Sequence, residues 1–166
     1  MRLIMDELVL IGKSVSTFGI KGELKVISDF EYKDKAFKVG NIILLNNQEH
    51  KITSVRYHKN YVLVTIDSLN NINYVLDYVG YNLYIKKGSL KLNESEYLYK
   101  DLIGAKVYEN DLYLGDVTEI INNSIYYLAR VKKEHEFLIP LIDNFIVRFA
   151  KDEKILYTKN ASSLNL

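Results

Sequence analysis

The residue types that perform most enzyme chemistry are scarce in this sequence. It has three histidines, His50, His58 and His135, and no cysteine. The absence of cysteine excludes thiolate metal sites, cysteine nucleophiles and disulfides. None of the histidines stands at a metal-binding spacing from another histidine, or from a carboxylate on a predicted helix. We therefore expect solvated histidines at strand ends and turns, no metal site and no cofactor.

Motifs for nucleotide binding and for a serine nucleophile are also missing. Residues 12–14, Gly-Lys-Ser, match only the end of a phosphate-binding loop, lack the upstream glycine and fall in a predicted strand. No Gly-x-Ser-x-Gly element, which would place a serine on a sharp turn, is present. The sequence therefore predicts no catalytic residue and a protein that is not an enzyme.

The remaining polar residues are suited to binding. Loops of small barrels are frequent nucleic-acid sites, and lysines at turns contact phosphates well. The candidates for contact with RNA or the ribosome are Lys13, Thr17, Phe18, Lys21, Lys25, Arg56, His58 and Lys59. A solvated charged rim is the alternative interpretation of each lysine.

A second candidate site holds aromatic residues. The chain has 14 tyrosines, 6 phenylalanines and no tryptophan, and tyrosine suits protein interfaces because it joins a large contact area to one polar tip. Tyr97 and Tyr99 lie outside the predicted strands, where we expect no barrel face for them to fill, and Asp101 follows them. These three residues are the predicted protein-binding surface. The alternatives are that the tyrosines plug an inter-domain groove and that Asp101 caps the local turn.

Strands dominate the elements that must position these residues. Apolar and β-branched patterns predict strands at 9–15, 22–27, 41–45, 51–57, 61–66 and 82–85, then at 105–108, 113–121, 126–132, 136–139, 145–149 and 155–157. One short amphipathic helix is predicted at 72–79, with Asn70 or Asn71 as N-cap, apolar Leu76 on its buried face and Gly80 after its end. Short strands at regular spacing favour an all-β fold of two small barrels.

A polar stretch at residues 87–96 is the predicted linker between the barrels. The expected domains are therefore an amino-terminal barrel at 1–86, a carboxy-terminal barrel at 97–160 and a loose tail at 161–166. Five glycines at turns and strand crossings are predicted to be structural, through positive φ or close backbone approach: Gly12, Gly19, Gly22, Gly104 and Gly115.

Net charge and composition narrow the classes of binding partner that we expect. Lys and Arg total 22 against 21 Asp and Glu, for a net charge of +1, whereas a protein that holds RNA mainly through phosphates usually has a basic excess. The balance favours a protein partner, although it leaves room for a local basic patch. No apolar run approaches the ~18 residues of a membrane span, and we expect no signal peptide, no membrane association and a cytoplasmic location.

Several segments resemble the RimM family of ribosome maturation factors. The first unit carries Gly12-Lys13 followed by Thr17-Phe18-Gly19-Ile20-Lys21-Gly22-Glu23-Leu24-Lys25-Val26, and later Arg56-Tyr57-His58-Lys59. The second carries Tyr97 and Tyr99-Lys100-Asp101-Leu102-Ile103-Gly104, then Leu114-Gly115-Asp116-Val117 and Leu138-Ile139-Pro140, which are similar to a PRC-type barrel. Phe18 stands where the family usually has histidine.

The resemblance implies a non-enzymatic assembly factor. It implies binding to the maturing head of the bacterial small ribosomal subunit, through the small-subunit ribosomal protein nineteen, with support for ribosomal RNA processing. We also expect a monomer. Two alternatives stay open. One is a barrel protein that acts directly on ribosomal RNA. The other is an enzyme with a pocket between the barrels, which would require Asp101, His58 and Glu23 to line it together.

Overall fold

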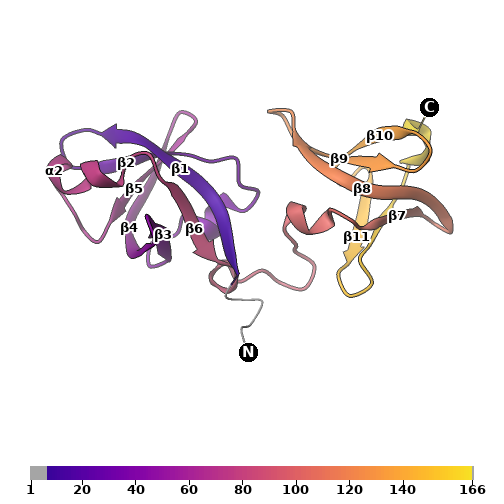
Figure 1. Cartoon of the computed structure of the whole chain (residues 1–166), viewed down its shortest axis with the longest axis horizontal. Helices are drawn as coiled ribbons and strands as arrows, with labels where there is room; N and C mark the ends of the chain where they lie inside the picture. The colour runs from indigo at the N-terminus through magenta and orange to yellow at the C-terminus, as the bar shows by residue number, and fades with distance from the viewer. Residues whose placement is uncertain (1–6, 166) are drawn as a thin grey trace. The chain divides into compact units, whose positions relative to one another are not determined.

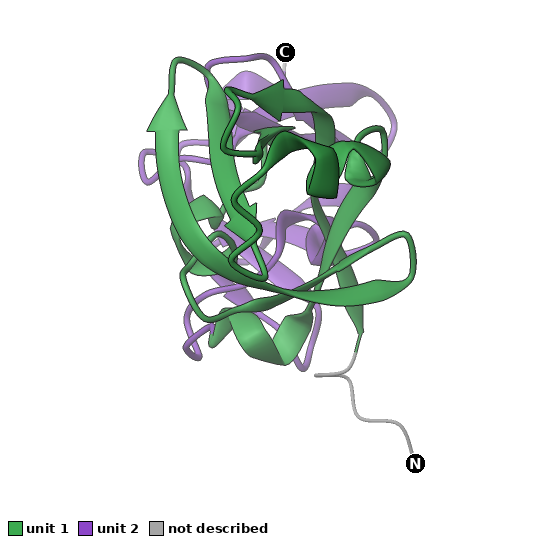
Figure 2. Cartoon of the chain, turned by 90° about the vertical axis from the view of Figure 1, so that its left-hand side faces the viewer, with its two compact units in different colours: residues 1–91 green, residues 92–166 purple. Residues whose placement is uncertain are grey.

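The chain folds as two compact units, Met1–Lys91 and Leu92–Leu166 (Figure 2), in a computed structural model that describes residues 7–165. The division lies within the predicted linker at 87–96. Residues Lys87–Leu90 form the 3₁₀ helix η3, which contacts strand β6 (Asn82–Lys86) of the first unit. Leu90 is only 2% exposed, and the Lys87 N–H donates to the Glu7 carbonyl at 2.8 Å. The first unit therefore extends past residue 86.

Six strands close the first unit into a barrel, in the order β1-β2-β5-β4-β3-β6 (Figure 1). Every neighbouring pair is antiparallel. The strands are β1 (Leu8–Phe18), β2 (Glu23–Ile27), β3 (Ile42–Leu45), β4 (Gln48–His58), β5 (Tyr61–Ile66) and β6 (Asn82–Lys86). Each strand falls within a few residues of its predicted position, because the apolar runs that form the core mark them in the sequence.

The alternation of side chains fills this barrel. Leu24 pairs with Val64 and Val26 with Val62, and all four side chains are at most 2% exposed. Burial of that kind stabilises by about 1.5–3 kcal/mol for each large aliphatic side chain. Leu63 lies on the opposite face of β5 from Val62 and Val64 and is also fully buried, so long side chains close over the outside of the sheet there.

A β-bulge in strand β4 decides which of its side chains face outward. Ile52 pairs with Ile66, but the next pair is Ser54 with Thr65, so Thr53 is the extra residue. After this bulge Arg56 lies opposite Leu63, on the outer face of the barrel. A strand without the bulge would place Arg56 on the same face as Ile52.

Two short helices accompany the first barrel. Helix α2 (Ile72–Val75) continues as the 3₁₀ helix η2 (Leu76–Tyr78), and Asn71 caps it by accepting a hydrogen bond from the Asn73 N–H. The predicted burial of Leu76 is wrong, since that side chain is 52% exposed. The cause is the change to a tighter 3₁₀ turn after Val75, which ends the 3.6-residue period. Helix α1 (Lys33–Ala36) was not predicted, because four residues hold too little of a pattern.

The second unit is a six-stranded sheet in the order β10-β9-β8-β7-β12-β11. Its strands are β7 (Lys106–Glu109), β8 (Leu112–Asn122), β9 (Tyr127–Lys132), β10 (Glu136–Pro140), β11 (Ile146–Ala150) and β12 (Ile155–Thr158). Strands β7 and β12 are parallel and the other pairs antiparallel. Over the described residues β10 and β11 do not pair, so the sheet is less completely closed than the predicted barrel.

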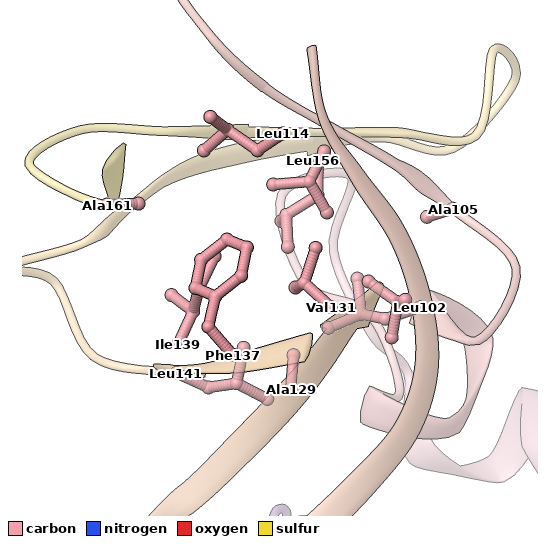
Figure 3. Packing of buried hydrophobic residues seen from close by; sticks show 12 residues of the cluster. Leu102, Ala105, Leu114, Ala129, Val131, Phe137, Ile139, Leu141, Leu156 and Ala161 are labelled. Atoms are coloured by element: carbon pink, nitrogen blue, oxygen red, sulfur yellow. The ribbon is translucent and has the colours of Figure 1, made fainter. Parts of the chain in front are cut away.

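This sheet surrounds one apolar core. Val131, Phe137, Ile139 and Leu156 come from three strands and point toward one another (Figure 3). None of the four is more than 8% exposed. The core thus joins strands from both halves of the strand order, which holds the curled sheet together although β10 and β11 do not pair.

The chain end of the second unit is bonded to strand β7, where the sequence predicts a loose tail from residue 161. The Glu109 carboxylate accepts hydrogen bonds from the Ala161 N–H at 2.6 Å, the Ser162 N–H at 3.1 Å and the Ser162 hydroxyl at 2.6 Å. Ala161 is fully buried, and Ser162–Leu164 form the 3₁₀ helix η5. This segment therefore belongs to the folded unit at least through residue 164.

Two of the singled-out glycines show why no other residue fits. Gly22 has φ of +84°, and a Cβ there would lie 2.9 Å from the Asn71 backbone. Gly115 has φ of +140°, and a Cβ there would lie 2.6 Å from the Lys132 carbonyl oxygen. Both positions combine a backbone conformation that L-residues avoid with direct contact against another strand or loop.

The prediction of an all-β fold of two small units is confirmed, with a closed six-stranded barrel in the first unit and a six-stranded sheet in the second. Within residues 7–165, none of the helices has the length and apolar character required to span a bilayer.

Candidate binding surfaces

Four strands of the first barrel bring six polar and aromatic side chains to one outer face. We call this set the outer face of the first barrel; it consists of Phe18 from β1, Glu23 and Lys25 from β2, Tyr61 from β5, and Arg56 and His58 from β4. In register, Phe18 lies opposite Glu23, and Leu63 lies between Lys25 on one side and Arg56 on the other. The structure thus gathers four of the eight predicted contact residues.

An ion pair fixes Arg56 on this face. Its Nε donates to Glu23 Oε2 and its NH2 to Glu23 Oε1, each at 2.8 Å, so the pair is bidentate. The hydrogen bond from Arg56 lowers the pKa of Glu23 below its ordinary value, and burial of that carboxyl opposes the effect. The Glu23 side chain is 17% exposed whereas Arg56 is 52% exposed. The acid is therefore enclosed and neutralised while the cation stays accessible.

Aromatic rings and cations are stacked beside this pair. The Arg56 guanidinium carbon lies 5.2 Å from the centre of the Phe18 ring, and the His58 ring lies 4.9 Å from the same ring at a tilt of 53°. The Lys25 Nζ lies 4.1 Å from the centre of the Tyr61 ring. Cations on aromatic faces at these distances are attracted by the ring quadrupole. The face is therefore both positively charged and rich in flat surfaces.

The other four predicted contact residues are not part of the outer face of the first barrel. Thr17 pairs with the buried Leu24 and faces the inner side of the sheet. Lys13 lies farther along β1, opposite Ile27. Lys21 and Lys59 are exposed and lie in the turns that follow β1 and β4, at the borders of the outer face.

Tyr97, Tyr99 and Asp101 lie at the start of the second unit, where Tyr99–Leu102 form the 3₁₀ helix η4. The expectation that the two tyrosines have no barrel face to fill is wrong. The Tyr97 ring lies 5.3 Å from Phe149 and the Tyr99 ring 4.9 Å from Tyr127, and both tyrosines pack against the apolar core. Leu102, at the end of η4, belongs to the same core and anchors this segment against the sheet. Both rings remain half-buried, so each keeps an accessible side.

A buried histidine was not foreseen. His50, expected to be solvated, is 6% exposed and points into the first barrel with Ile43 opposite it. Its Nδ1 lies 2.6 Å from Asp67 Oδ2, and its ring lies 4.6 Å from Tyr78. Its Nε2 is buried and has no hydrogen-bond partner in the described part of the chain. The available signal was the spacing of two between His50 and Ile52, which places both on one face of a strand.

The other histidines and acidic residues of the described chain form no additional candidate site. His135 is exposed at the turn between β9 and β10, as expected. Among residues 7–165 no group of three or more histidine, aspartate or glutamate side chains is arranged to hold a metal ion. His58 and Glu23 both lie on the outer face of the first barrel, whereas Asp101 belongs to the second unit.

Known proteins of one family are similar to this chain. A family model described as the RimM N-terminal domain matches residues 9–90. The Ribosome maturation factor RimM of Staphylococcus haemolyticus is 35% identical over 155 residues, covering 89% of this chain and 93% of that protein. The protein of the same name from Bacillus cytotoxicus is 34% identical over 155 residues, covering 87% and 90%. The solved N-terminal domain of RimM from Thermus thermophilus is 15% identical, with a TM-score of 0.45, covering 51% of this chain and 94% of that domain.

Proposed function

The chain belongs to the RimM family of ribosome maturation factors, and we propose on this premise that it is a non-enzymatic assembly factor. In this proposal it binds the head of the immature bacterial small ribosomal subunit and supports processing of the subunit's RNA. The observation that carries the proposal is 35% identity over 93% of a protein named as a ribosome maturation factor. We place the protein in the cytoplasm as a monomer.

The hydrogen bonds that Glu23 and Asp67 accept support a binding role over catalysis. Both oxygens of Glu23 accept hydrogen bonds from Arg56. Both oxygens of Asp67 are also occupied, one by His50 and one by the Lys51 N–H at 2.8 Å. Carboxylates held in this way stabilise the barrel and are poorly placed to take a proton from a substrate.

The protein partner in this proposal is the small-subunit ribosomal protein nineteen, and its binding surface is formed by Tyr97, Tyr99 and Asp101. Half-buried rings packed on a core are rigid, so little side-chain entropy is lost when a partner covers them. Tyrosine is also among the residues that most often dominate binding energy at protein interfaces. Release from the mature particle requires only that the surface binds the immature form more tightly.

The functional test is complementation. A bacterial host that lacks its own family member should regain normal small subunits and normal levels of precursor ribosomal RNA when it expresses this chain. Sedimentation profiles and primer extension on the small-subunit RNA measure the two results. Persistent precursor accumulation in cells that contain the folded protein would overturn the proposal.

The protein-binding surface needs variants that preserve the core. Substituting Tyr97 and Tyr99 with phenylalanine keeps the ring contacts and removes the hydroxyls, and Asp101→Asn removes one charge. We expect the triple variant to unfold like the wild type but to lose at least tenfold in affinity for the purified partner protein, since one buried polar contact is worth about 1.5 kcal/mol. Unchanged affinity would remove these residues from the interface.

A second contact is favoured by the outer face of the first barrel, which we propose lies against ribosomal RNA of the head. Lys25 and Arg56 lie on this face, and Lys21 and Lys59 border it. Binding through phosphates predicts that the logarithm of the affinity falls linearly with the logarithm of the salt concentration. Affinity for a head RNA fragment that is independent of salt would count against this contact.

A further inference from the structure

We infer that Arg56 is a stacking platform for one unpaired nucleobase of single-stranded RNA. This inference rests on the proposed contact between the first barrel and ribosomal RNA, and it names the kind of RNA structure that the face accepts. It goes beyond attraction between lysines and phosphates, because a flat surface for a base selects unpaired segments over regular duplex.

The orientation of the guanidinium group carries the inference. Two hydrogen bonds of 2.8 Å to the two Glu23 oxygens lie along one edge of the group, and such a bidentate pair holds the guanidinium and carboxylate close to one plane. These bonds occupy the edge and leave the flat faces free of hydrogen bonds to Glu23. Arg56 is therefore held in one orientation before any ligand arrives.

The guanidinium group already lies over an aromatic ring. The guanidinium carbon is 5.2 Å from the centre of Phe18, and Phe18 is supported by the His58 ring at 4.9 Å. The Arg56 side chain is nonetheless 52% exposed. The Phe18 ring thus contacts both a histidine ring tilted by 53° and an arginine that is cationic and open to solvent.

The charges around the platform favour RNA over a protein ligand. Lys25 lies on the same face, and Lys21 and Lys59 are exposed in the adjoining turns. The carboxylate of the face, Glu23, is neutralised by its bonds to Arg56. A base on the guanidinium would place its flanking phosphates within the field of these ammonium groups, whereas the bases of a duplex are covered by their neighbours.

The second unit contains a natural control. Arg148 lies 4.3 Å from the centre of the Tyr157 ring and is exposed. Unlike Arg56, it has no carboxylate partner within residues 7–165. Its guanidinium therefore lies over a ring but is not fixed by a carboxylate. Arg148→Lys makes the same replacement of arginine by lysine and leaves Arg56 and its partners unchanged.

The test uses the full chain and a short single-stranded RNA that carries one fluorescent adenine analogue. Wild type is expected to quench the analogue on binding, whereas the same RNA in a duplex should bind at least tenfold more weakly. Arg56→Lys keeps the charge and removes the flat group, so it should weaken single-strand binding about five- to a hundredfold and abolish quenching. The slope of affinity against salt should be unchanged because the charge remains. Arg148→Lys should bind and quench as wild type does.

The remaining outcomes separate this inference from the function on which it rests. Salt-dependent RNA binding that Arg56→Lys leaves intact, without quenching, would overturn the platform and keep the RNA contact. No RNA binding by the wild type would overturn both. Equal losses in Arg56→Lys and Arg148→Lys would assign the effect to arginine in general and refute the platform. RNA binding unchanged in Arg56→Lys, with lost affinity for a purified head protein, would make the face a protein site. Thermal unfolding of each variant checks that the first barrel remains folded.

Discussion

Removal of the Asp67 carboxylate should selectively destabilise the first barrel. His50 is 6% exposed, and Asp67 is its hydrogen-bond partner at 2.6 Å. The other ring nitrogen is buried and has no partner among residues 7–165. Asp67→Ala would leave the whole imidazole without a partner and would also free the Lys51 N–H that Asp67 now accepts at 2.8 Å. A hydrogen bond to a charged group contributes about 1.5–3 kcal/mol. Because Asp67 is 40% exposed and water replaces part of each bond, we expect a net loss of about 2–4 kcal/mol.

The measurement must distinguish the two units, since each has its own core. Urea unfolding followed by NMR gives a separate transition for amide signals of the first and second units. Asp67→Ala should lower the midpoint of the first unit and leave the second unchanged. Asp67→Asn keeps an oxygen that can accept from the Lys51 N–H, so it should lower the stability of the first unit less than Asp67→Ala does. Asp116→Ala is the matched control, because it removes a carboxylate that accepts from the Tyr113 hydroxyl in the second unit.

A double-mutant cycle then isolates the bond between Asp67 and His50. With His50→Leu already in place, the imidazole that needs a partner is gone, so Asp67→Ala should cost at least 1 kcal/mol less than in the wild type, by an order-of-magnitude estimate. Full additivity of the two changes, or a loss below about 0.5 kcal/mol for Asp67→Ala alone, would refute the reasoning that the pair is a coupled element of the core.

Acid should weaken the same pair. Partial burial raises the pKa of Asp67, but the hydrogen bonds from His50 and from the Lys51 N–H outweigh it, and the pKa lies below its ordinary value of 3.8. A carboxyl with a depressed pKa in the folded state stabilises the fold at every pH above its unfolded value. That contribution is lost as the pH falls from about 3.8 through the lower folded pKa. The stability difference between wild type and Asp67→Ala should therefore shrink over that interval.

Three further predictions concern other parts of the chain. Leu90→Ala should destabilise the first unit by about 2–5 kcal/mol, because a fully buried leucine is truncated; the urea transition of that unit measures it. Gly115→Ala should destabilise the second unit by more than about 1 kcal/mol, since its Cβ would lie 2.6 Å from the Lys132 carbonyl oxygen; an unchanged transition would contradict this contact. The hydrogen bond to Asp116 raises the pKa of Tyr113 to about 12, so ultraviolet titration should show one late phenolic ionisation that Asp116→Asn shifts to lower pH.

The strands could be predicted from the sequence because their apolar residues carry the information locally. Runs such as the one at 61–66 are apolar on both faces, and strand β5 occupies those same residues. Helix α2 was also found, through its Asn71 cap. The apolar pattern did not predict how many residues of this segment form a regular α-helix. A 3₁₀ turn follows Val75, and just beyond it the Gly80 N–H donates to the Ser14 carbonyl of β1 at 2.8 Å, a contact far along the chain that no local pattern reveals.

The ends of the units were harder to place, because their partners are far along the chain. The polar composition of residues 87–96 predicts a linker, yet Leu90 packs on the first unit. The segment from residue 161 has little apolar content, yet Glu109, more than fifty residues earlier, accepts its hydrogen bonds. In both places, long-range packing or hydrogen bonding decides whether the segment is folded, and the local composition does not.

The candidate RNA surface shows most clearly what the sequence could not reveal. Residue type and the family resemblance identified Phe18, Arg56 and His58, but simple alternation along β4 from the buried Ile52 places Arg56 and His58 inside the barrel. The extra residue at Thr53 reverses that parity, and Thr53 itself is held because its hydroxyl donates to the Thr65 carbonyl and accepts from the Ser68 N–H. A bulge fixed by bonds to another strand and a following turn leaves no periodic signal in β4. The surface that we propose for a nucleobase therefore depends on one residue that does not touch it.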